Sequence, residues 1–503
     1  RPPRSTLFPY PTLFRSIAAG VLQVLAFPPV GWWWTAPLGV ALLIVAIRDQ
    51  GGGRAALLGL VCGWAFFLPL LHWLNVLGPD AWLALALVIA GWYAAMGWGF
   101  SVVLQTRWWV LAVPVVWVLQ EWLRSRFPWG GLGWGRLAFG QPESPLTGWV
   151  TIGGATLLSF VIALTGCLLV AMMSRGRVAL LAAVTVVAIA GVGITVYPRP
   201  SASETPTSSQ LAVIQGNVPQ PGIDFLGRPM QVLGNHVRTT DELASAVATG
   251  EEPQPDALIW PENSSDIDPV VSGPAGAAVS SAARSIGVPI LVGTVQEVPG
   301  RPDQVANVGL AWDPVTGPGQ AYVKQHPVPF GEFLPLRPLL SRVITRFDRV
   351  PRDFIAGDTP GVVQLGPARI ADVICFEVSN DEIVREGVRE GGRALVVQTN
   401  NATYATTAQP EQQYDISRLR ARETGRTVLV AATTGVTAVI TPDGASRTLP
   451  QLQSGWINTE VFLKDSWTPA VRFGGPVDAV LSAAGLMAVL LGLWARRRVT
   501  DPR

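Results

Sequence analysis

Long apolar segments separated by short polar loops fill the first two hundred residues of the chain, and one more lies near its end. A helix needs about 20 apolar residues to cross the roughly 30 Å hydrocarbon core of a bilayer. Eight segments approach that length, at residues 17–33, 35–47, 55–77, 81–104, 108–123, 149–173, 178–196 and 476–494. The pattern predicts a multi-pass α-helical membrane domain with about eight spans. The first two segments are short and share the junction FPPVGWWW, so their limits are the least defined.

Residues 197–475 show a different pattern, with ordinary polarity and no segment that could span a bilayer. Short apolar runs that end in turn residues alternate there with polar segments of helical periodicity. Strands are expected within 210–220, 256–264, 289–297, 369–377 and 394–401, and helices at 231–248, 275–286, 381–391 and 412–424. Several of these strands are apolar throughout, as in sheets covered by helices, so we expect a layered α/β domain of about 270 residues.

The expected organisation has five parts. Residues 17–196 form the membrane domain with seven spans, 197–475 the α/β domain, 476–494 the last span and 495–503 a cytoplasmic tail. Residues 1–16 contain TLFPYPTLFRS, which differs at Pro11 from the translation of a common sequencing adapter. We interpret 1–16 as an assembly artefact that replaces the true N-terminus, with a genuine proline-rich tail as the alternative.

Composition narrows the class of protein. Only 14% of the residues are charged, against about 25% in soluble proteins, and the mean hydropathy is +0.34. These values exclude a disordered chain, a coiled coil and an ordinary cytosolic enzyme. A formal net charge of +2 gives no reason to expect a nucleic-acid partner.

Arginine placement predicts the orientation in the membrane, because short cytoplasmic loops are rich in Lys and Arg. With eight spans, four groups of arginines fall on one side: Arg48 and Arg54; Arg107; Arg175 and Arg177; and Arg496, Arg497 and Arg498. Both termini are then cytoplasmic, and the 197–475 domain is extracytoplasmic. The loop with Arg124, Arg126 and Arg136 falls on the opposite side, so either it has a function of its own or the count of spans is wrong.

Three polar residues at the ends of expected strands or hairpins are candidates for chemistry. Cys375 ends the strand RIADVIC and could be a nucleophile if its thiolate is stabilised; the alternative is a buried structural cysteine. Glu262 ends the apolar run LIWPE, where poor solvation suits a general base; the alternative is an exposed loop carboxylate. Lys324 is one of only two lysines in the chain, which indicates a site that needs a compact ammonium instead of a guanidinium.

Other catalytic arrangements find little support in the sequence. The three cysteines are widely spaced and suggest neither a disulfide framework nor a zinc site. No GxSxG motif and no glycine-rich phosphate loop is present, and of the three histidines only His326 lies near a candidate. We therefore expect no metal and no cofactor.

The order Glu262, Lys324, Cys375 resembles the Glu-Lys-Cys triad of the nitrilase, or carbon–nitrogen hydrolase, superfamily. The matching segments are WPE, YVKQHPVPFGEF and ICFE. Together with the spans, the chain resembles the apolipoprotein N-acyltransferase family, also in FPPVGWW (27–33), VVWVLQEWLRSRFPWGGLGW (115–134) and GRTVLVAATTGVTAVITPDG (425–444). TNNATY (399–404) departs from the Ser-Asn-Asp-Ala-Trp-Phe run of proteobacterial members and is similar to actinobacterial ones, which leaves the contacts of this loop with substrate open.

The resemblance implies an extracytoplasmic α-β-β-α sandwich that moves an acyl chain from a phospholipid to the N-terminal diacylglyceryl-cysteine amine of a lipoprotein. It implies Cys375 as the nucleophile that carries the acyl chain as a thioester, Glu262 as the general base and Lys324 as the donor to the oxyanion. Glu332 and Glu377 are expected to support Lys324 and the cysteine loop. The expected partners are the phospholipid donor, the diacylated apolipoprotein and the membrane, and the protein is expected to be monomeric.

Two other functions stay open at this stage. A membrane-tethered nitrilase-type amidase would use the same triad with water as the acceptor. A transporter or scaffold would use the outer domain only for binding. Transport would favour charged residues deep inside the spans, but the charged residues within the expected spans, such as Glu121, lie near span ends.

Overall fold

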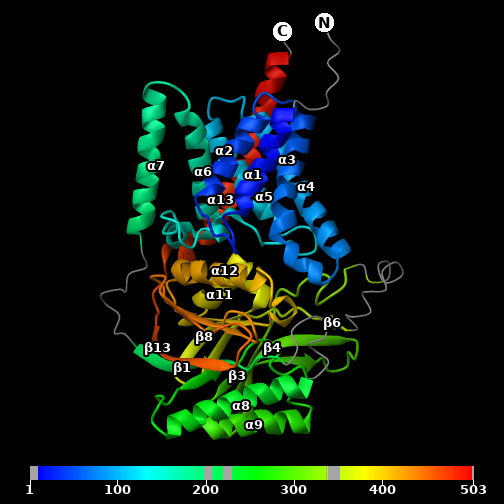
Figure 1. Cartoon of the computed structure of the whole chain (residues 1–503), viewed down its shortest axis with the longest axis vertical. Helices are drawn as coiled ribbons and strands as arrows, with labels where there is room; N and C mark the ends of the chain where they lie inside the picture. The colour runs from blue at the N-terminus through cyan, green and yellow to red at the C-terminus, as the bar shows by residue number, and fades with distance from the viewer. Residues whose placement is uncertain (1–9, 197–206, 219–228, 336, 338–351, 501–503) are drawn as a thin grey trace. The chain divides into compact units, whose positions relative to one another are not determined.

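The computed structural model describes residues 10–196, 207–218, 229–335, 337 and 352–500. It divides into two compact units: Arg1–Tyr197 with Phe473–Arg503, and Pro198–Arg472. The first is a helical bundle and the second a layered α/β structure (Figure 1). Residues 1–9 of the expected artefact lie outside the described residues, and its assignment stays a prediction.

The described part of the helical unit contains eight α-helices, and every expected span overlaps one of them. They are α1 (Tyr10–Val24), α2 (Thr35–Ile47), α3 (Gly52–Leu70), α4 (Pro79–Val103), α5 (Trp109–Arg124), α6 (Trp149–Met172), α7 (Arg177–Thr195) and α13 (Pro469–Thr500), with the short 3₁₀ helices η1 (His72–Val76) and η2 (Leu137–Gly140). Five of the α-helices, α3, α4, α6, α7 and α13, are long and apolar enough to cross a membrane. The unit is therefore that of a membrane protein, and the full count of eight spans stays a prediction.

Several helix limits differ from the expected ones, and prolines are the main reason. Helix α1 covers Tyr10–Val24 instead of 17–33; it begins before the expected start, and it ends ahead of the Pro28-Pro29 pair, which cannot continue a helix. Helix α3 ends at Leu70, one residue after Pro69, and the chain continues as η1 instead of extending the helix to residue 77. Helix α13 starts at Pro469, ahead of the expected start at 476.

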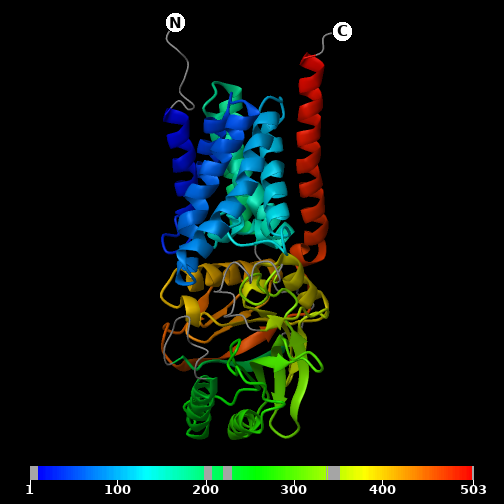
Figure 2. The ribbon, with the colours of Figure 1, turned by 90° about the vertical axis from the view of Figure 1, so that its right-hand side faces the viewer.

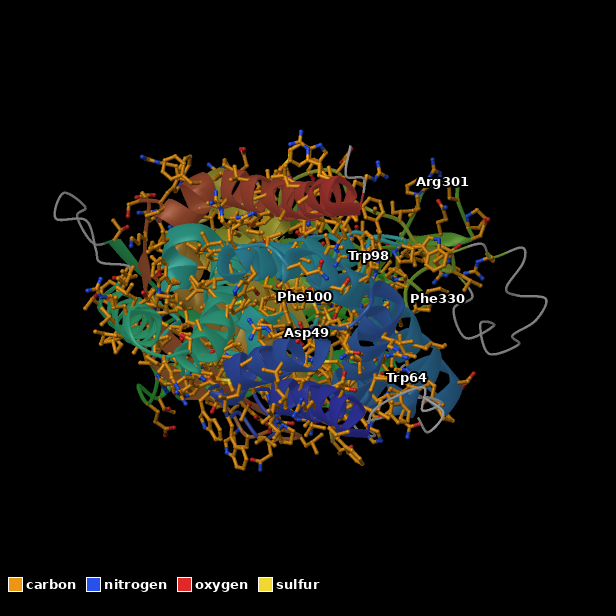
Figure 3. All side chains as sticks on the ribbon, turned by 90° about the horizontal axis from the view of Figure 1, so that it is seen from above. Asp49, Trp64, Trp98, Phe100, Arg301 and Phe330 are labelled. Atoms are coloured by element: carbon orange, nitrogen blue, oxygen red, sulfur yellow. The ribbon has the colours of Figure 1, made fainter. Side chains whose placement is uncertain are left out.

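Small residues bring the helices of this unit close together. A Cβ added to Gly59 of α3 would lie 2.1 Å from the carbonyl oxygen of Tyr93 on α4. Glycine at such contacts lets two helix backbones approach closely, as is common in membranes. On α4 itself, Phe100 is buried whereas Trp98 is exposed, as is Trp64 on α3 (Figure 3 labels all three). The exposed tryptophans leave large apolar surface that suits a lipid environment.

Two of the three arginines that disagreed with the charge rule, Arg124 and Arg136, are buried inside this unit. The Arg124 guanidinium donates to the carbonyl oxygens of Leu132 and Trp134, which folds the loop after α5 back onto the helix end. The Nε of Arg136 lies 3.5 Å from the Glu121 carboxylate. Both arginines are buried, so they stabilise the loop, and their position does not report on the orientation of the protein in the membrane.

The described part of the second unit contains two β-sheets. In the first, the strand order is β13-β1-β2-β3-β4-β5, with β6 paired to β4. Its strands are β1 (Thr207–Gln215), β2 (Ala257–Ile259), β3 (Ile290–Glu297), β4 (Gln304–Asp313), β5 (Gly317–Val323), β6 (Asp353–Phe354) and β13 (Gly455–Leu463). The second sheet has the order β12-β11-β10-β9-β8-β7, with β7 (Val362–Leu365), β8 (Ala368–Ile374), β9 (Ala394–Thr399), β10 (Val428–Ala432), β11 (Ala438–Ile440) and β12 (Ser446–Thr448).

Helices cover the outer face of each sheet, which gives four layers (Figure 2). Helices α8 (Pro229–Ala248) and α9 (Gly273–Ile286) pack on the first sheet through a core that includes Leu243, Val279 and Val292. Helices α11 (Asp381–Arg389) and α12 (Gln409–Thr424) pack on the second. The two sheets face each other across a second apolar core, in which Ile259 and Ile374 are both fully buried. This is the α-β-β-α arrangement that the resemblance to the carbon–nitrogen hydrolase superfamily implies, and it agrees with the layered α/β domain expected from the strand and helix pattern.

Parallel pairing places the carboxyl ends of several strands at one edge. Strands β1, β2 and β3 are mutually parallel in the first sheet, and β8, β9 and β10 in the second. Side chains that follow such strands gather where the strands end, as in other α/β folds with functional sites. Glu262 follows β2, and Cys375 follows β8.

Candidate active site

The predicted glutamate and lysine meet in a buried ion pair. Glu262 and Lys324 lie 62 residues apart in sequence, yet the Lys324 Nζ is 3.4 Å from Glu262 Oε1. It is closer still, at 2.8 Å, to Oε1 of Glu332. Only 1% of the lysine side chain is exposed, so the ammonium has almost no water around it. A buried cation is stable only when it is paired and hydrogen-bonded, and the two carboxylates supply both conditions.

The two carboxylates determine the charge state of this lysine. Burial by itself lowers the pKa of Lys324, but the negative charges of Glu332 and then Glu262 act in the opposite direction. The net result is a pKa well above the usual value, so Lys324 is a permanent cation at any physiological pH. Lys324 therefore serves as a fixed positive charge and hydrogen-bond donor, and it is unsuited to act as a general base.

Asn307 holds the two glutamates at a fixed separation. It lies in β4, and its Nδ2 donates to Glu262 Oε1 at 2.7 Å and to Glu332 Oε1 at 3.0 Å. The other oxygen of Glu262 accepts the backbone N–H of Asn400 at 2.8 Å, and the other oxygen of Glu332 accepts that of Val328 at 2.7 Å. Both carboxylates are thus oriented at both oxygens, and neither can rotate without losing a hydrogen bond.

Cys375 lies at the sharp turn between β8 and the 3₁₀ helix η5 (Cys375–Ser379). Its φ is +54°, a left-handed conformation that is uncommon for a residue with a side chain and that recurs at functional sites. Burial raises the pKa of the Cys375 thiol to about 12, and the Glu262 carboxylate adds to the rise. The Lys324 ammonium and a hydrogen bond with the Thr399 side chain both favour the thiolate. Cys375 therefore needs a base and nearby donors before it can react as a thiolate.

Glu377 ties the lysine segment to the cysteine turn. The carboxylate is fully buried and accepts the backbone N–H groups of Gln325, at 2.7 Å, and of Ile374, at 2.7 Å. It also accepts the Tyr322 hydroxyl at 3.0 Å. Burial raises the pKa of Glu377, while Lys324 and these hydrogen bonds oppose the rise. One side chain thus fixes the strand ends that carry Lys324 and Cys375.

The structure adds residues that the sequence reasoning missed. Asn307 had a visible signal, since it is the one amide within the apolar run ANVGLAW of β4. Thr399 and Asn400 are the first two residues of the TNNATY segment. Thr399 favours the thiolate of Cys375, and the backbone N–H of Asn400 donates to Glu262. Asp372 is buried between the sheets, where burial and then the charges of Glu377 and Glu262 raise its pKa well above the usual range.

Chemically, the arrangement combines a carboxylate, a permanent ammonium and a thiol in a site largely shielded from water. Those are the parts needed for acyl transfer through a cysteine: a base, an oxyanion donor and a nucleophile. Among the described residues, no group of three or more His, Cys, Asp and Glu side chains could hold a metal ion.

Comparisons with known proteins assign the family. Residues 19–168 match the model of the apolipoprotein N-acyltransferase N-terminal domain, and residues 244–459 match that of carbon-nitrogen hydrolases. The apolipoprotein N-acyltransferase of Mycolicibacterium smegmatis is 38% identical over 96% of this chain and 85% of that protein, and that of Methylococcus capsulatus is 31% identical over 96% of each. A mutant of a nitrilase-superfamily amidase from Nesterenkonia matches 55% of this chain and 95% of that chain, with 17% identity and a TM-score of 0.35. At these identities over nearly its whole length, the chain belongs to the apolipoprotein N-acyltransferase family and is a membrane acyltransferase of the carbon–nitrogen hydrolase superfamily.

Proposed function

We propose that this chain moves an acyl chain from a membrane phospholipid to the α-amine of the N-terminal diacylglyceryl-cysteine of a lipoprotein, through a thioester on Cys375. The observation that carries the proposal is the buried Lys324 ammonium, held 3.4 Å from Glu262 and 2.8 Å from Glu332, with its charge acting on Cys375. An amine acceptor is also what the names of the relatives imply.

In the first half-reaction, Glu262 removes the proton from the Cys375 thiol. Its Oε1 is occupied by Lys324 and Asn307, whereas Oε2 accepts one backbone N–H, so Oε2 has a lone pair for this proton. The thiolate attacks the ester carbonyl carbon of the phospholipid, and the charge that develops on the carbonyl oxygen is stabilised by Lys324. One such donor contributes about 3 kcal/mol to the transition state. The C–O bond then breaks, the lysophospholipid oxygen takes the proton from Glu262, and the S-acyl enzyme remains.

In the second half-reaction, the neutral amine of the lipoprotein attacks the thioester carbonyl. Glu262 accepts a proton from the attacking nitrogen, the C–S bond breaks, and the Cys375 sulfur recovers that proton. The product is an amide, and the enzyme returns to its starting state. Because both substrates are anchored in a bilayer, a catalytic unit attached to membrane helices converts a three-dimensional search into a lateral one and gains from proximity.

We also propose that the catalytic unit lies outside the cytoplasm, with both chain ends inside. The four groups of arginines on one side of an eight-span bundle support this orientation. A reporter enzyme that is active only outside the cytoplasm, inserted at Gly250 in the turn after α8, should be active. A fluorescent protein that folds only in the cytoplasm should fluoresce when fused after residue 503. The opposite pattern would refute the orientation without affecting the chemistry.

Covalent labelling tests the nucleophile. Full-length protein in lipid nanodiscs that contain a phospholipid with a radiolabelled acyl chain should take up label that neutral hydroxylamine releases, as expected of a thioester. Cys375→Ala should abolish the label. Cys167→Ala should retain it, because that cysteine is buried within α6 of the helical unit. Label on the Cys375→Ala protein would show that another group is the nucleophile.

A product assay separates transfer from hydrolysis. With a diacylated lipopeptide present, the transferase should release lysophospholipid and form the N-acylated peptide in equal amounts. A nitrilase-type amidase would instead release ammonia from a small amide and leave the lipopeptide unchanged. That second pattern would refute the proposed acceptor.

A further inference from the structure

Thr399 is a neighbour of the nucleophile that the roles proposed above leave unused. It is the last residue of β9, which runs parallel to β8 with Ile374 opposite Gln398. Thr399 follows Gln398 as the last residue of β9, and Cys375 follows Ile374 as the first residue after β8, so the pairing places both residues at the same end of neighbouring strands. Only 1% of Thr399 is exposed. A buried hydroxyl at this place must find its hydrogen-bond partners within the protein.

The Thr399 hydroxyl has two neighbours that could share its proton. It donates to Oε1 of Gln413 on α12, at 3.0 Å, and it favours the thiolate form of Cys375, which follows β8 beside the end of β9. A hydroxyl has one proton to donate and lone pairs to accept with, so it can donate to only one of these partners at a time. When it donates to Gln413, its oxygen is free to accept the S–H of Cys375.

Gln413 does not depend on the threonine proton. Its Oε1 also accepts the Asn401 Nδ2 at 2.8 Å and lies 3.4 Å from the Gln409 Nε2. If the Thr399 hydroxyl rotates and its proton points away from Gln413, this carbonyl oxygen keeps other hydrogen bonds, so the rotation costs little free energy. The Cys375 sulfur, in contrast, is strongly stabilised by a hydrogen-bond donor once it is a charged thiolate. The Lys324 ammonium favours the thiolate but also binds Glu332 and Glu262, so a hydroxyl donor adds to what the cation supplies.

We propose that the Thr399 hydroxyl is a two-position hydrogen-bond switch that positions the Cys375 sulfur and stabilises its thiolate. In the resting enzyme it donates to Gln413 Oε1 and accepts from the S–H group. When Glu262 removes the thiol proton, the hydroxyl rotates and donates to the thiolate, and Asn401 keeps the Gln413 oxygen satisfied. The same rotation in reverse accompanies the return of the proton after the thioester is resolved. Thr399 is thus a positioning residue for both half-reactions, and its part in the reaction rests on the function proposed above.

Alkylation of Cys375 by iodoacetamide tests the switch without any lipid substrate. The rate is followed against pH on full-length protein in nanodiscs by mass spectrometry of the Cys375 peptide, with Cys375→Ala as the blank. Cys62 and Cys167 are buried in the helical unit and give separate peptides. Thr399→Val keeps the size of the side chain but removes the hydroxyl, and Thr399→Ser keeps the hydroxyl.

The valine variant should move the pH profile to higher pH by about one unit, so that alkylation at a given pH below the midpoint is about ten-fold slower. The serine variant should stay within a few tenths of a unit of the unaltered protein. A purely structural role would not move the profile in this selective way. An unshifted profile for Thr399→Val, or an equal shift for Thr399→Ser, would overturn the proposal.

A second variant keeps the test decisive if Thr399→Val does not fold. Gln413→Met removes the resting acceptor, so the hydroxyl is left with the sulfur alone and the profile should move to lower pH. A shift to higher pH, or none, would overturn the switch. The outcome is independent of the acyl donor and acceptor: if the labelling of Cys375 by phospholipid fails while the alkylation shifts appear, the proposed function is wrong and the switch stands.

Discussion

Replacing Lys324 by methionine should expose how strongly the two glutamates depend on the cation. The Nζ lies 2.8 Å from Glu332 and 3.4 Å from Glu262, which corresponds to gross attractions of about 6 and about 5 kcal/mol at an effective dielectric constant near 20. The desolvation of three buried charges offsets much of this. Removing one partner from a buried ion pair nevertheless costs about 3–5 kcal/mol, because it leaves a charge uncompensated.

For Lys324→Met we therefore expect a loss of about 3–5 kcal/mol in the free energy of unfolding at pH 7. For a unit of this size the loss lowers the melting temperature by roughly 6–20 °C. Acyl-enzyme formation should fall by at least about a hundred-fold, as expected for the loss of an oxyanion donor.

A double variant separates stability from catalysis. Lys324→Met with Glu332→Gln removes one positive and one negative charge, so it should recover more than half of the lost stability but none of the acylation activity. Thermal unfolding in nanodiscs and the labelling assay supply the two readouts. Arg238→Met is the matched control, because its ion pair with Glu242 is exposed, with N···O 3.9 Å, and should contribute less than about 1 kcal/mol. A Lys324→Met protein as stable as the unaltered one at pH 7, or a double variant less stable than the single one, would refute the reasoning.

Three further predictions concern the same unit. Asn307→Leu should slow acyl-enzyme formation about ten- to hundred-fold in the labelling assay, because two buried carboxylate oxygens lose their shared donor; an unchanged rate would contradict this. Gly309→Ala should lower the unfolding free energy by about 1–3 kcal/mol in denaturant titrations, since its Cβ would lie 2.1 Å from the Asp372 carboxylate; Gly319→Ala, whose nearest contact is 3.6 Å, is the control. His236 is buried and neutral, and burial lowers its pKa to about 4 from a usual value near 6.5. The unfolded state therefore binds more protons between these values, so stability should be complete above about pH 6.5 and fall by about 3 kcal/mol as the pH drops to 4, and His236→Gln should lose this part of the pH dependence.

Much of the fold could be predicted from the sequence, because the patterns that indicate its helices and strands are local. Apolar segments of membrane length, and the alternation of short apolar strands with polar helices, require no knowledge of distant contacts. The helices expected at 275–286 and 412–424 are α9 and α12, which begin two and three residues earlier. The helix limits near Pro28 and Pro69 were less well predicted, because hydropathy continues through a proline that the helix geometry does not tolerate.

In the candidate site, too, some residues could be predicted from the sequence and others only from the tertiary structure. The strand ends and the resemblance to a known family singled out Glu262, Lys324 and Cys375 from the sequence, because those residue types are rare in such places. Asn307 and Thr399 could not be assigned, because an amide or a hydroxyl in a strand has no chemical identity until its partners are known. Those partners come from other strands and from helix α12.

The sequence by itself thus indicated the apolar segments of membrane length, the layered α/β unit and three candidate groups for catalysis, since each depends on the order of residues along the chain. The tertiary structure decided the charge and protonation of these groups. It made Lys324 a permanent cation by burying it against two carboxylates, and it left the Cys375 thiol reliant on donors by placing it at a partly buried turn beside Glu262. Solvation and charge act through space, and only folding sets which groups are neighbours.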